Sequence, residues 1–219
     1  MGGTRRYRPG LFRYVVAGGL VPPARDEDAR ALDVGGGMAE FAEVLRSKGY
    51  ATELTDLSAS NVENARERGF GAHRIDLNEG LPGLEDDAYD VVGMLEIIEH
   101  VVASERLLAD ARRVLRPGGV LVLSTPNYGF VQERLQTLAG RPPIAEGYHY
   151  RFFTIRTMRA QLARAGLRIV AERFSSPAIG ANVVRRRLMR KTDRKHVMIP
   201  RGLASAFAQT MYFLARKPG

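Results

Sequence analysis

The sequence contains no cysteine and no long uninterrupted apolar run. Without cysteine the chain can form neither a disulfide scaffold nor a thiolate site, so any metal or catalytic site must use other side chains. A membrane-spanning helix needs about 18 or more consecutive apolar residues, so no transmembrane segment is expected. The four histidines are the only imidazole groups that could bind a metal ion or act as a base. These absences lead us to expect a cytoplasmic protein.

The positive charge of the chain is concentrated in one stretch. The formal net charge is +9, and residues 185–195 (RRRLMRKTDRK) hold seven cations and one anion, which is +6 of that total. Such a stretch can bind the phosphates of a nucleic acid, lie on an anionic lipid surface, or form a solvated helix face. RNA is therefore one candidate partner, and the sequence leaves the three interpretations open.

The distribution of apolar residues predicts one α/β domain that spans residues 1–219. Hydrophobic residues make up 45% of the chain, which is enough for one substantial core. Short apolar strands alternate with amphipathic helices, and this order favours a doubly wound, mostly parallel sheet. We expect seven strands, at residues 30–34, 50–56, 72–76, 89–95, 120–126, 167–174 and 209–217. The expected helices span residues 38–49, 58–69, 104–115 and 154–165.

A glycine-rich loop follows the first expected strand. Ligands of open α/β sheets bind beyond the carboxyl ends of the strands, and the segment DVGGGMA (33–39) lies there. Gly35 and Gly37 allow tight turns and let the backbone approach a ligand closely. The dinucleotide pattern G-x-G-x-x-G would need a glycine where the chain has Glu40, and a carboxylate there repels phosphate groups. The loop therefore favours a ligand that lacks phosphates and carries a positive charge.

Acidic residues end the next two expected strands. Asp56 closes the second strand, where its carboxylate can accept hydrogen bonds from two ribose hydroxyls. Asp76 closes the third strand and can accept from an adenine amino group, to which Leu77 can add its backbone amide. Each acid alone could equally be a turn or loop residue. Because they follow the glycine loop in order, after three successive strands, together they predict a nucleoside site.

Six motifs form a series along the chain: LDVGGGMA, LTDLS, IDL, YDVV…EIIEHV, RVLRPGGVLVLSTPN and HYRFFT. This series covers about residues 30–175 and resembles the class I S-adenosylmethionine-dependent methyltransferases. The final LARKP resembles the closing strand of that family, and Ala39 departs from it, because the family usually has a third glycine there. The resemblance implies a Rossmann-like methyltransferase fold with an antiparallel closing strand, and S-adenosyl-L-methionine as cofactor.

The same resemblance assigns the cofactor-binding residues. It implies that Asp33 and Gly35 flank the methionine moiety, and that adenine lies against Asp76 and Leu77. The complete expected set is Asp33, Gly35, Gly36, Gly37, Asp56, Leu57, Asp76, Leu77 and Leu95.

The single domain is expected to have three parts. Residues 1–28 form an N-terminal arm that could close over the cofactor as a lid, and residues 29–126 form the cofactor-binding core. Residues 127–219 supply the substrate-side loops, a basic insertion at residues 177–207 and the closing strand.

The segment EIIEH (96–100) places two carboxylates and an imidazole among apolar neighbours. Glu96, Glu99 and His100 have i, i+3, i+4 spacing, which would put them on one face of a helical turn. Because the segment follows the fourth strand, this face should look into the cleft beside the transferable methyl group. A hydroxyl acceptor must lose its proton during methyl transfer. Either His100 removes the proton as a general base, or a bound divalent metal ion acidifies the hydroxyl.

His149 in HYRFFT is a candidate fourth ligand. EIIEH followed by a distant histidine resembles two branches, the small-RNA 3′-terminal 2′-O-methyltransferases and the ubiquinone-pathway O-methyltransferases. The resemblance implies a metal site of Glu96, Glu99, His100 and His149, whose mixed ligands suit manganese, iron or zinc at least as well as magnesium. His100 and His149 are thus the catalytic candidates. Metal-free catalysis by His100 and purely structural roles are the alternatives.

The predicted function is S-adenosylmethionine-dependent O-methylation of a small-molecule hydroxyl. A phenolic, quinone-precursor or sugar-containing acceptor would suit the aromatic residues around HYRFFT. One alternative is an RNA 2′-O-methyltransferase that uses residues 185–195. Another is a non-catalytic cofactor-binding protein, because STPNYGFVQERLQTLAG resembles a stretch of a methionine-biosynthesis protein of this fold. The sequence indicates no oligomeric state.

Overall fold

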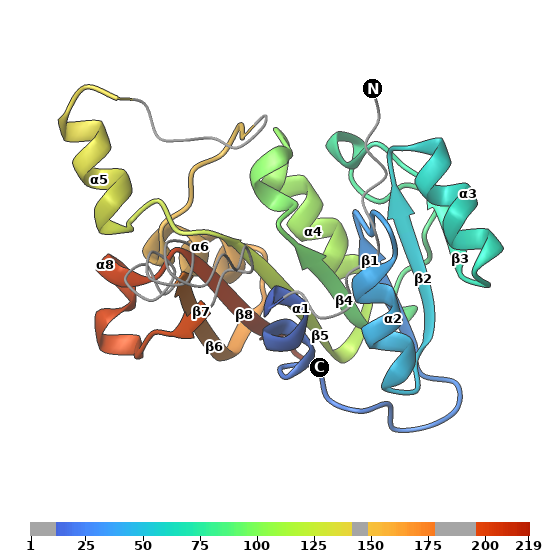
Figure 1. Cartoon of the computed structure of the whole chain (residues 1–219). Helices are drawn as coiled ribbons and strands as arrows, with labels where there is room; N and C mark the ends of the chain where they lie inside the picture. The colour runs from blue at the N-terminus through green and yellow to red at the C-terminus, as the bar shows by residue number, and fades with distance from the viewer. Residues whose placement is uncertain (1–11, 142–148, 178–195) are drawn as a thin grey trace, which may run out of the picture.

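The computed structural model describes residues 12–141, 149–177 and 196–219. Within these ranges eight strands form one sheet, in the order β3-β2-β1-β4-β5-β8-β6-β7 (Figure 1). The basic stretch 185–195 lies outside the described residues. None of the helices in the described ranges combines the length and the apolar character that crossing a bilayer requires.

The elements follow the alternation that the sequence predicts. The strands are β1 (Arg30–Val34), β2 (Ala51–Asp56), β3 (Gly71–Arg74), β4 (Tyr89–Leu95), β5 (Leu115–Pro126), β6 (Arg168–Pro177), β7 (His196–Met198) and β8 (Thr210–Arg216). The helices are α1 (Phe12–Gly18), α2 (Glu40–Ser47), α3 (Ala59–Glu67), α4 (Ser104–Val114), α5 (Val131–Leu138), α6 (Ile155–Arg164) and α8 (Ala204–Phe207), with 3₁₀ turns η1 (Leu77–Glu79), η2 (Ile98–His100) and η3 (Arg201–Leu203). Every strand and helix expected from the sequence is present.

The expected count of seven strands is wrong, because β7 adds an eighth strand to the described sheet. β7 has three residues and pairs antiparallel with Ser175–Pro177 at the end of β6. A strand this short leaves no room for an alternating apolar pattern, so the sequence carries no signal for it. It forms because β6 continues past residue 174, where the prediction ended it, and offers β7 a free edge.

Strands β1 to β5 run parallel, so their carboxyl ends lie at the same edge of the sheet. β1 pairs parallel with β2 and β4, β2 pairs parallel with β3, and β4 pairs parallel with β5. β8 lies antiparallel between β5 and β6. The fold is therefore doubly wound and mostly parallel, with antiparallel closing strands. The loops that follow β1, β2 and β4 consequently meet at one edge of the sheet, where a ligand of this architecture binds.

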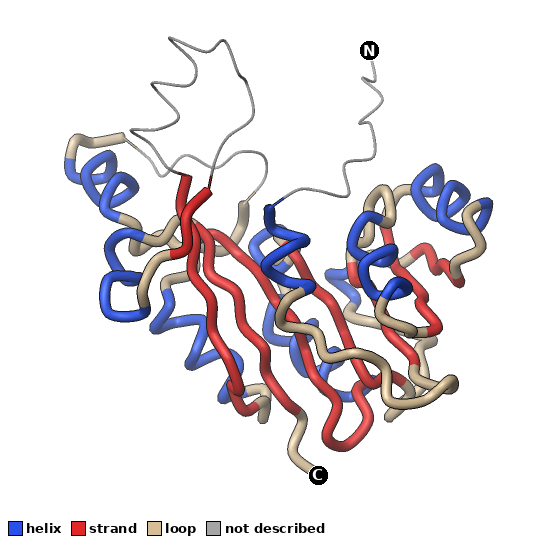
Figure 2. Tube along the Cα trace, turned by 60° about the horizontal axis from the view of Figure 1, so that its bottom comes forward, coloured by secondary structure: helices blue, strands red, loops and turns tan. Residues whose placement is uncertain are grey.

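Helices cover both faces of the sheet (Figure 2). On one face, Ala17 of α1 and Leu45 of α2 belong to a buried cluster with Tyr212 of β8. On the other face, Leu108 of α4 and Met158 of α6 belong to a second buried cluster. Both apolar faces of the central strands are therefore covered, which explains their nearly continuous hydrophobic sequences.

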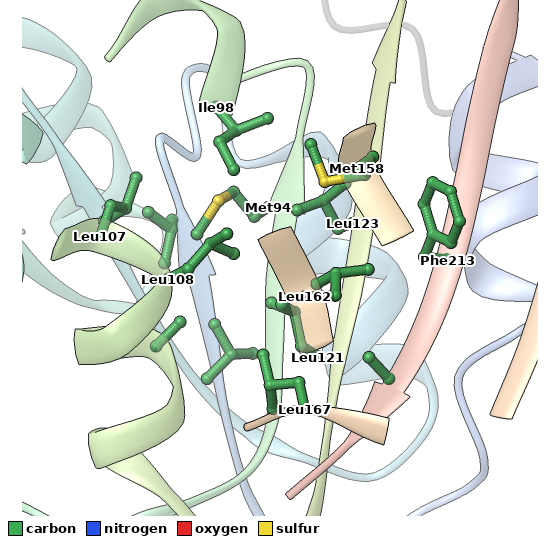
Figure 3. Packing of buried hydrophobic residues seen from close by; sticks show 14 of the residues in the cluster. Met94, Ile98, Leu107, Leu108, Leu121, Leu123, Met158, Leu162, Leu167 and Phe213 are labelled. Carbon is green, nitrogen blue, oxygen red and sulfur yellow. The ribbon is translucent and has the colours of Figure 1, made fainter. Parts of the chain in front are cut away.

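Buried apolar side chains pack around β4 and β5, the two strands that lead into the site (Figure 3). Met94 of β4 and Leu123 of β5 are fully buried in the cluster that includes Leu162 of α6. Burying a side chain of this size stabilises a fold by about 1.5–3 kcal/mol. The carboxyl ends of β4 and β5, which carry the polar residues described below, are thus anchored by their own apolar faces.

Capping side chains define the start of two helices near the site. The Thr154 hydroxyl accepts from the Thr157 amide at 3.2 Å, and the Thr157 hydroxyl accepts from the Thr154 amide at 2.8 Å. Ser58 caps α3 by accepting from the Asn61 amide at 3.4 Å. A cap of this kind is worth about 1 kcal/mol. α6 and α3 thus begin at the expected positions, with Thr154 and Ser58 as their caps.

Candidate active site

The glycine loop after β1 has a backbone that only small residues tolerate. Gly35, Gly37 and Ala39 have φ values of 70°, 53° and 58°, all in the left-handed region. A Cβ atom at position 35 would lie 2.2 Å from Cδ1 of Ile97, whereas one at position 37 would meet nothing within 4 Å. Gly35 is therefore required by close packing against the segment after β4, and Gly37 faces open space.

Asp56 lies directly beside this loop. Its carboxylate accepts from the Gly37 amide at 2.9 Å, from the Ser58 amide at 2.8 Å and from the Asn61 side chain at 3.1 Å. The Gly36 amide also donates to the carbonyl oxygen of Thr55 at 2.9 Å. The structure thus brings together the glycine loop and the acid that closes β2, as the sequence predicts.

Asp33 contributes a buried carboxylate below the loop. The residue is 3% exposed, and its Oδ2 atom has no hydrogen-bond partner among the described residues. Burial is the main cause that raises the pKa of Asp33 to about 8; the nearby charges of Asp56 and Glu40 add to the rise, and a hydrogen bond from the Ala42 amide opposes it. A positively charged ligand beside Asp33 would therefore favour its ionised form.

The other expected cofactor contacts surround this edge of the sheet. Asp76 is exposed after β3 and caps η1 by accepting from the Asn78 amide at 3.0 Å. Leu57 is 60% exposed, so its apolar side chain is available to a ligand. Leu77 and Leu95 are half-buried and pack against the core.

The described part of the N-terminal arm reaches the loop. Tyr14 of α1 donates its hydroxyl hydrogen bond to Glu40 at 3.0 Å, and burial raises the pKa of this phenol. Glu40 stands in the first turn of α2, directly after the glycine loop. The arm therefore packs beside the loop at this point, while residues 1–11 lie outside the described residues.

A pocket of about 730 Å³ lies beyond the ends of β4 and β5. We call it the acceptor pocket. It is lined by Arg13, Glu96, Glu99, His100, Pro126, Asn127, Tyr128, Gln132, Glu133, His149, Pro177, His196, Gln209 and Thr210. All four residues of the predicted metal site border this pocket.

The two carboxylates in the acceptor pocket are held by neighbouring hydroxyls. Ser124 donates to Glu96 at 2.6 Å, and Thr125 donates to Glu99 at 3.0 Å. Burial raises the pKa of Glu96, and burial together with the charge of Glu96 raises the pKa of Glu99 to about 8. Two neighbouring acids, of which Glu99 is buried, favour a bound cation, because a positive charge would reduce their mutual repulsion and offset the desolvation of their charged forms.

The imidazoles complete a compact group. One potential ligand atom from each of Glu99, His100 and His149 lies within 4.8 Å of those from the other two. The rings of His100 and His149 meet edge to face with their centroids 4.5 Å apart. Glu96 lines the same pocket but falls outside this group of three. His149 is therefore brought to EIIEH from a distant segment, as the sequence predicts.

The prediction that Glu96, Glu99 and His100 share one face of a helical turn is wrong. Only residues 98–100 form a 3₁₀ turn, and Glu96 precedes it with φ of 56°. Glu96 is held in this left-handed conformation by the hydrogen bond from its amide to the Ser124 carbonyl, at 3.0 Å, which continues the β4–β5 pairing. The three polar residues thus reach the pocket through a strand end and a short turn rather than through an α-helix.

The individual contacts within the pocket were not expected from the sequence. Tyr128 places its hydroxyl 2.6 Å from Nδ1 of His149. Arg13 of α1 and His196 of β7 line the pocket from elements that lie far from EIIEH in the sequence. The only local signal for Ser124, Thr125 and Tyr128 is their position at or just after the carboxyl end of the apolar strand β5.

An apolar groove of about 640 Å³ adjoins the acceptor pocket. It is lined by Phe130, Val131, Gln132, Leu135, Gln136, Ala139, Arg141, Ser176, Pro177, Val197, Ile199 and Phe207. Gln132 and Pro177 line both cavities, so the two lie side by side. No residue of α5 is buried against the described part of the chain, and Leu135 on this helix is 60% exposed. Figure 1 shows α5 standing apart from the sheet.

Comparison with known proteins identifies the family. A family model described as a methyltransferase domain matches residues 5–172. A ubiquinone biosynthesis O-methyltransferase of Parvibaculum lavamentivorans is 31% identical over 153 residues, which are 65% of this chain and 60% of that protein. A "Probable S-adenosylmethionine-dependent methyltransferase" of Mycolicibacterium smegmatis is 29% identical over 63% of this chain and 51% of its own length. The chain thus spans between half and three fifths of these two relatives.

Solved structures share the fold at lower sequence identity. An S-adenosylmethionine dependent methyltransferase of Mesorhizobium loti has a TM-score of 0.66 and 20% identity, and the match covers 94% of this chain and 98% of that chain. The 1,6-didemethyltoxoflavin-N1-methyltransferase of Burkholderia thailandensis has a TM-score of 0.60 and 17% identity over 96% of this chain and 80% of its own. The chain therefore belongs to the methyltransferase domain family and has the fold of the class I S-adenosylmethionine-dependent methyltransferases.

Proposed function

We propose that the chain transfers the methyl group of S-adenosyl-L-methionine to a hydroxyl oxygen of a small-molecule acceptor. The observation that carries this proposal is that one segment, residues 96–100, contacts the glycine loop and also lines the acceptor pocket. Ile97 packs against the glycine loop, while Glu99 and His100 line the acceptor pocket. A methyl donor on the loop would therefore direct its sulfonium group toward the acceptor pocket.

The glycine loop and its neighbours fit this methyl donor. The Asp56 carboxylate, already engaged with the Gly37 amide, would accept hydrogen bonds from the ribose hydroxyls. The unpartnered Oδ2 of Asp33 would face the positively charged methionine moiety. Glu40 adds negative charge where a phosphate-bearing cofactor would need the opposite. The exposed Leu57 offers adenine an apolar contact.

The acceptor pocket supplies groups that can remove a proton. During in-line transfer the acceptor oxygen bonds to the methyl carbon as the bond from that carbon to sulfur breaks, so the protein must place the oxygen and accept its proton. A ring nitrogen of His100 or His149 would accept that proton. A divalent metal ion held by Glu99, His100 and His149 would instead lower the pKa of a hydroxyl bound to it. Two imidazoles and one carboxylate suit Mn²⁺, Fe²⁺ or Zn²⁺ as well as Mg²⁺.

We infer an acceptor with a hydroxylated head and an apolar part. The acceptor pocket holds the polar and titratable groups, and the groove that lies beside it is mostly apolar. A cavity of this size accommodates a ligand of several rings or a short chain. The relative named as a ubiquinone biosynthesis O-methyltransferase supports a phenolic or quinone-precursor head. An RNA acceptor would depend on residues 185–195, and no feature of the described residues favours it.

The proposal is tested by an assay of methyl transfer to alkyl-substituted catechols, read by mass spectrometry of the product. We expect activity that chelator abolishes and Mn²⁺ restores, and a His149→Ala variant at least about 100-fold less active. His73→Ala is the matched control, because His73 lies on β3 and contacts Glu53 at 2.8 Å, away from the pocket. Full activity in chelator would exclude the metal-assisted mechanism and leave proton removal by a histidine. Cofactor binding without transfer to any hydroxyl acceptor would contradict the proposal and favour a non-catalytic role.

A further inference from the structure

Three hydroxyl side chains in the segment STPNY (124–128) each hold one polar group of the acceptor pocket. Ser124 donates to Glu96, and Thr125 donates to Glu99. The third, Tyr128, places its hydroxyl 2.6 Å from Nδ1 of His149. One short segment at the end of β5 therefore fixes side chains that come from two distant parts of the chain.

Tyr128 is itself held firmly. Its amide donates to the Phe153 carbonyl at 2.8 Å, and its ring meets the Phe152 ring edge to face with centroids 4.6 Å apart. The backbone after His149 is tied down as well, because the amides of Tyr150 and Arg151 both donate to the Glu99 carbonyl, at 2.9 and 3.1 Å. The imidazole of His149 is thus fixed by its backbone on one side and by a phenol at its Nδ1 atom.

A neutral imidazole carries its proton on one nitrogen and a lone pair on the other, and the hydrogen bond at one nitrogen selects the state of the other. If Nδ1 donates to Tyr128, the lone pair is on Nε2. If the phenol donates to Nδ1, Nε2 carries the proton instead and can neither bind a metal ion nor accept a proton. The two arrangements therefore make opposite predictions for the chemistry of the pocket.

We propose that Tyr128 is a positioning residue that accepts the Nδ1 hydrogen of His149 and so presents the Nε2 lone pair to Glu99 and His100. The proposal deepens the proposed function, because a metal ligand and a general base both need this lone pair. Geometry supports it, because a ligand atom of His149 already lies within 4.8 Å of those of Glu99 and His100.

The tautomer is read directly by ¹⁵N–¹H NMR of histidine-labelled protein treated with chelator. At about pH 8.5, above the ordinary histidine pKa, we expect His149 to show a protonated Nδ1 and an unprotonated Nε2. His149→Gln assigns the signal. Tyr128→Phe keeps the ring against Phe152 but removes the oxygen, and should convert His149 to a mixture of tautomers. Tyr50→Phe is the matched control, because the Tyr50 hydroxyl bonds the Pro22 carbonyl at 3.1 Å, away from the pocket.

A protonated Nε2 in the wild-type protein would overturn the proposal, as would an unchanged His149 signal in Tyr128→Phe. The wild-type spectrum decides the tautomer even if the variant does not fold.

Metal affinity provides a second readout. In Mn²⁺ titrations followed by electron paramagnetic resonance, Tyr128→Phe should bind about 10-fold or more weakly than wild type, as is usual when a group behind a metal-bound histidine is removed. Tyr50→Phe should bind as wild type does. Absence of Mn²⁺ binding to the wild-type protein would end the metal part of the proposed function, and the NMR spectrum would still decide whether Tyr128 orients His149. Equal Mn²⁺ affinity in Tyr128→Phe and wild type would count against the positioning role.

Discussion

The cofactor half and the acceptor half of the site are built in different ways. In the cofactor half, the glycine loop and Asp56 come from the ends of two neighbouring strands, and backbone amides make most of the contacts. In the acceptor half, Glu99 and His149 come from distant segments and are held by the side-chain hydroxyls of Thr125 and Tyr128. The first half therefore depends on backbone conformation, and the second depends on individual polar side chains.

This difference predicts how each half responds to substitution. A substitution in the glycine loop should reduce both stability and cofactor affinity, because larger residues adopt the left-handed backbone conformation there only with strain. A change in the acceptor half should leave the fold and cofactor affinity nearly intact and alter acceptor or metal chemistry. Each half also contains one buried carboxylate with a pKa of about 8, Asp33 and Glu99.

The largest effect is expected for Gly35→Ala. The new Cβ would lie 2.2 Å from Ile97 at a φ of 70°, so left-handed strain and overpacking combine to destabilise the fold by about 2–4 kcal/mol. Gly69→Ala is the matched control, because Gly69 has a φ of 78° but nothing within 4 Å of its added Cβ, and it should cost about 1–2 kcal/mol. Urea denaturation measures both. Equal losses would mean that contact with Ile97 does not constrain the loop.

Asp56→Ala should weaken binding of S-adenosylmethionine by about 1.5–3 kcal/mol, because hydrogen bonds to a charged group are lost. Thr125→Val in the acceptor half is the comparison, and its cofactor affinity should match that of wild type. Calorimetric titration measures both affinities. Unchanged affinity in Asp56→Ala would remove the ribose assignment, and a loss in Thr125→Val would show that the two halves are not separate.

Stability of the ligand-free protein should fall as the pH rises from about 5 to about 8. Asp33 and Glu99 have folded-state pKa values near 8, far above those of exposed acids, so the folded state keeps protons that the unfolded chain releases. This contribution is fully present below about pH 4 and is lost as the pH passes through about 8. Asp33→Asn and Glu99→Gln should therefore each flatten the slope and stabilise the protein at pH 8 by about 1–3 kcal/mol. Denaturation at several pH values in chelator tests this, and slopes equal to wild type would contradict it.

The smallest change in stability is expected for Leu135→Ser on α5. Leu135 is 60% exposed and lines the groove, so its replacement should alter stability by less than about 0.5 kcal/mol. The KM for an alkyl-substituted acceptor should rise several-fold, and that for an unsubstituted acceptor should not. Leu138→Ser is the control, because Leu138 is 84% exposed on the same helix and does not line the groove. Equal KM changes in both variants would exclude the groove as the site of the apolar part.

The sequence predicted the cofactor half well because its signals are local. Gly35 and Gly37 stand where positive φ is needed, and Asp56 ends a strand whose apolar pattern is clear. Parallel pairing of β1 with β2 then brings loop and acid together without further information. The residue assignments to ribose and adenine stay predictions.

The acceptor half could be predicted only in part. The residue types of EIIEH and His149 indicate a polar site. The hydroxyls of Ser124 and Tyr128 carry no such signal, because their roles depend on the fold, which places one at the end of β5 and the other just after it. The left-handed conformation of Glu96 also has no sequence signal, since it depends on pairing with β5. The three-residue β7 could not be predicted for the same reason, because its extended conformation depends on pairing with β6.

The most direct test of the account is a crystal structure of the chain with S-adenosylhomocysteine. We predict the ligand over the glycine loop, with both ribose hydroxyls on the Asp56 carboxylate and the sulfur atom directed toward Glu99 and His100. A ligand bound elsewhere, or a loop closed by the protein's own side chains with no ligand at saturating concentration, would contradict it.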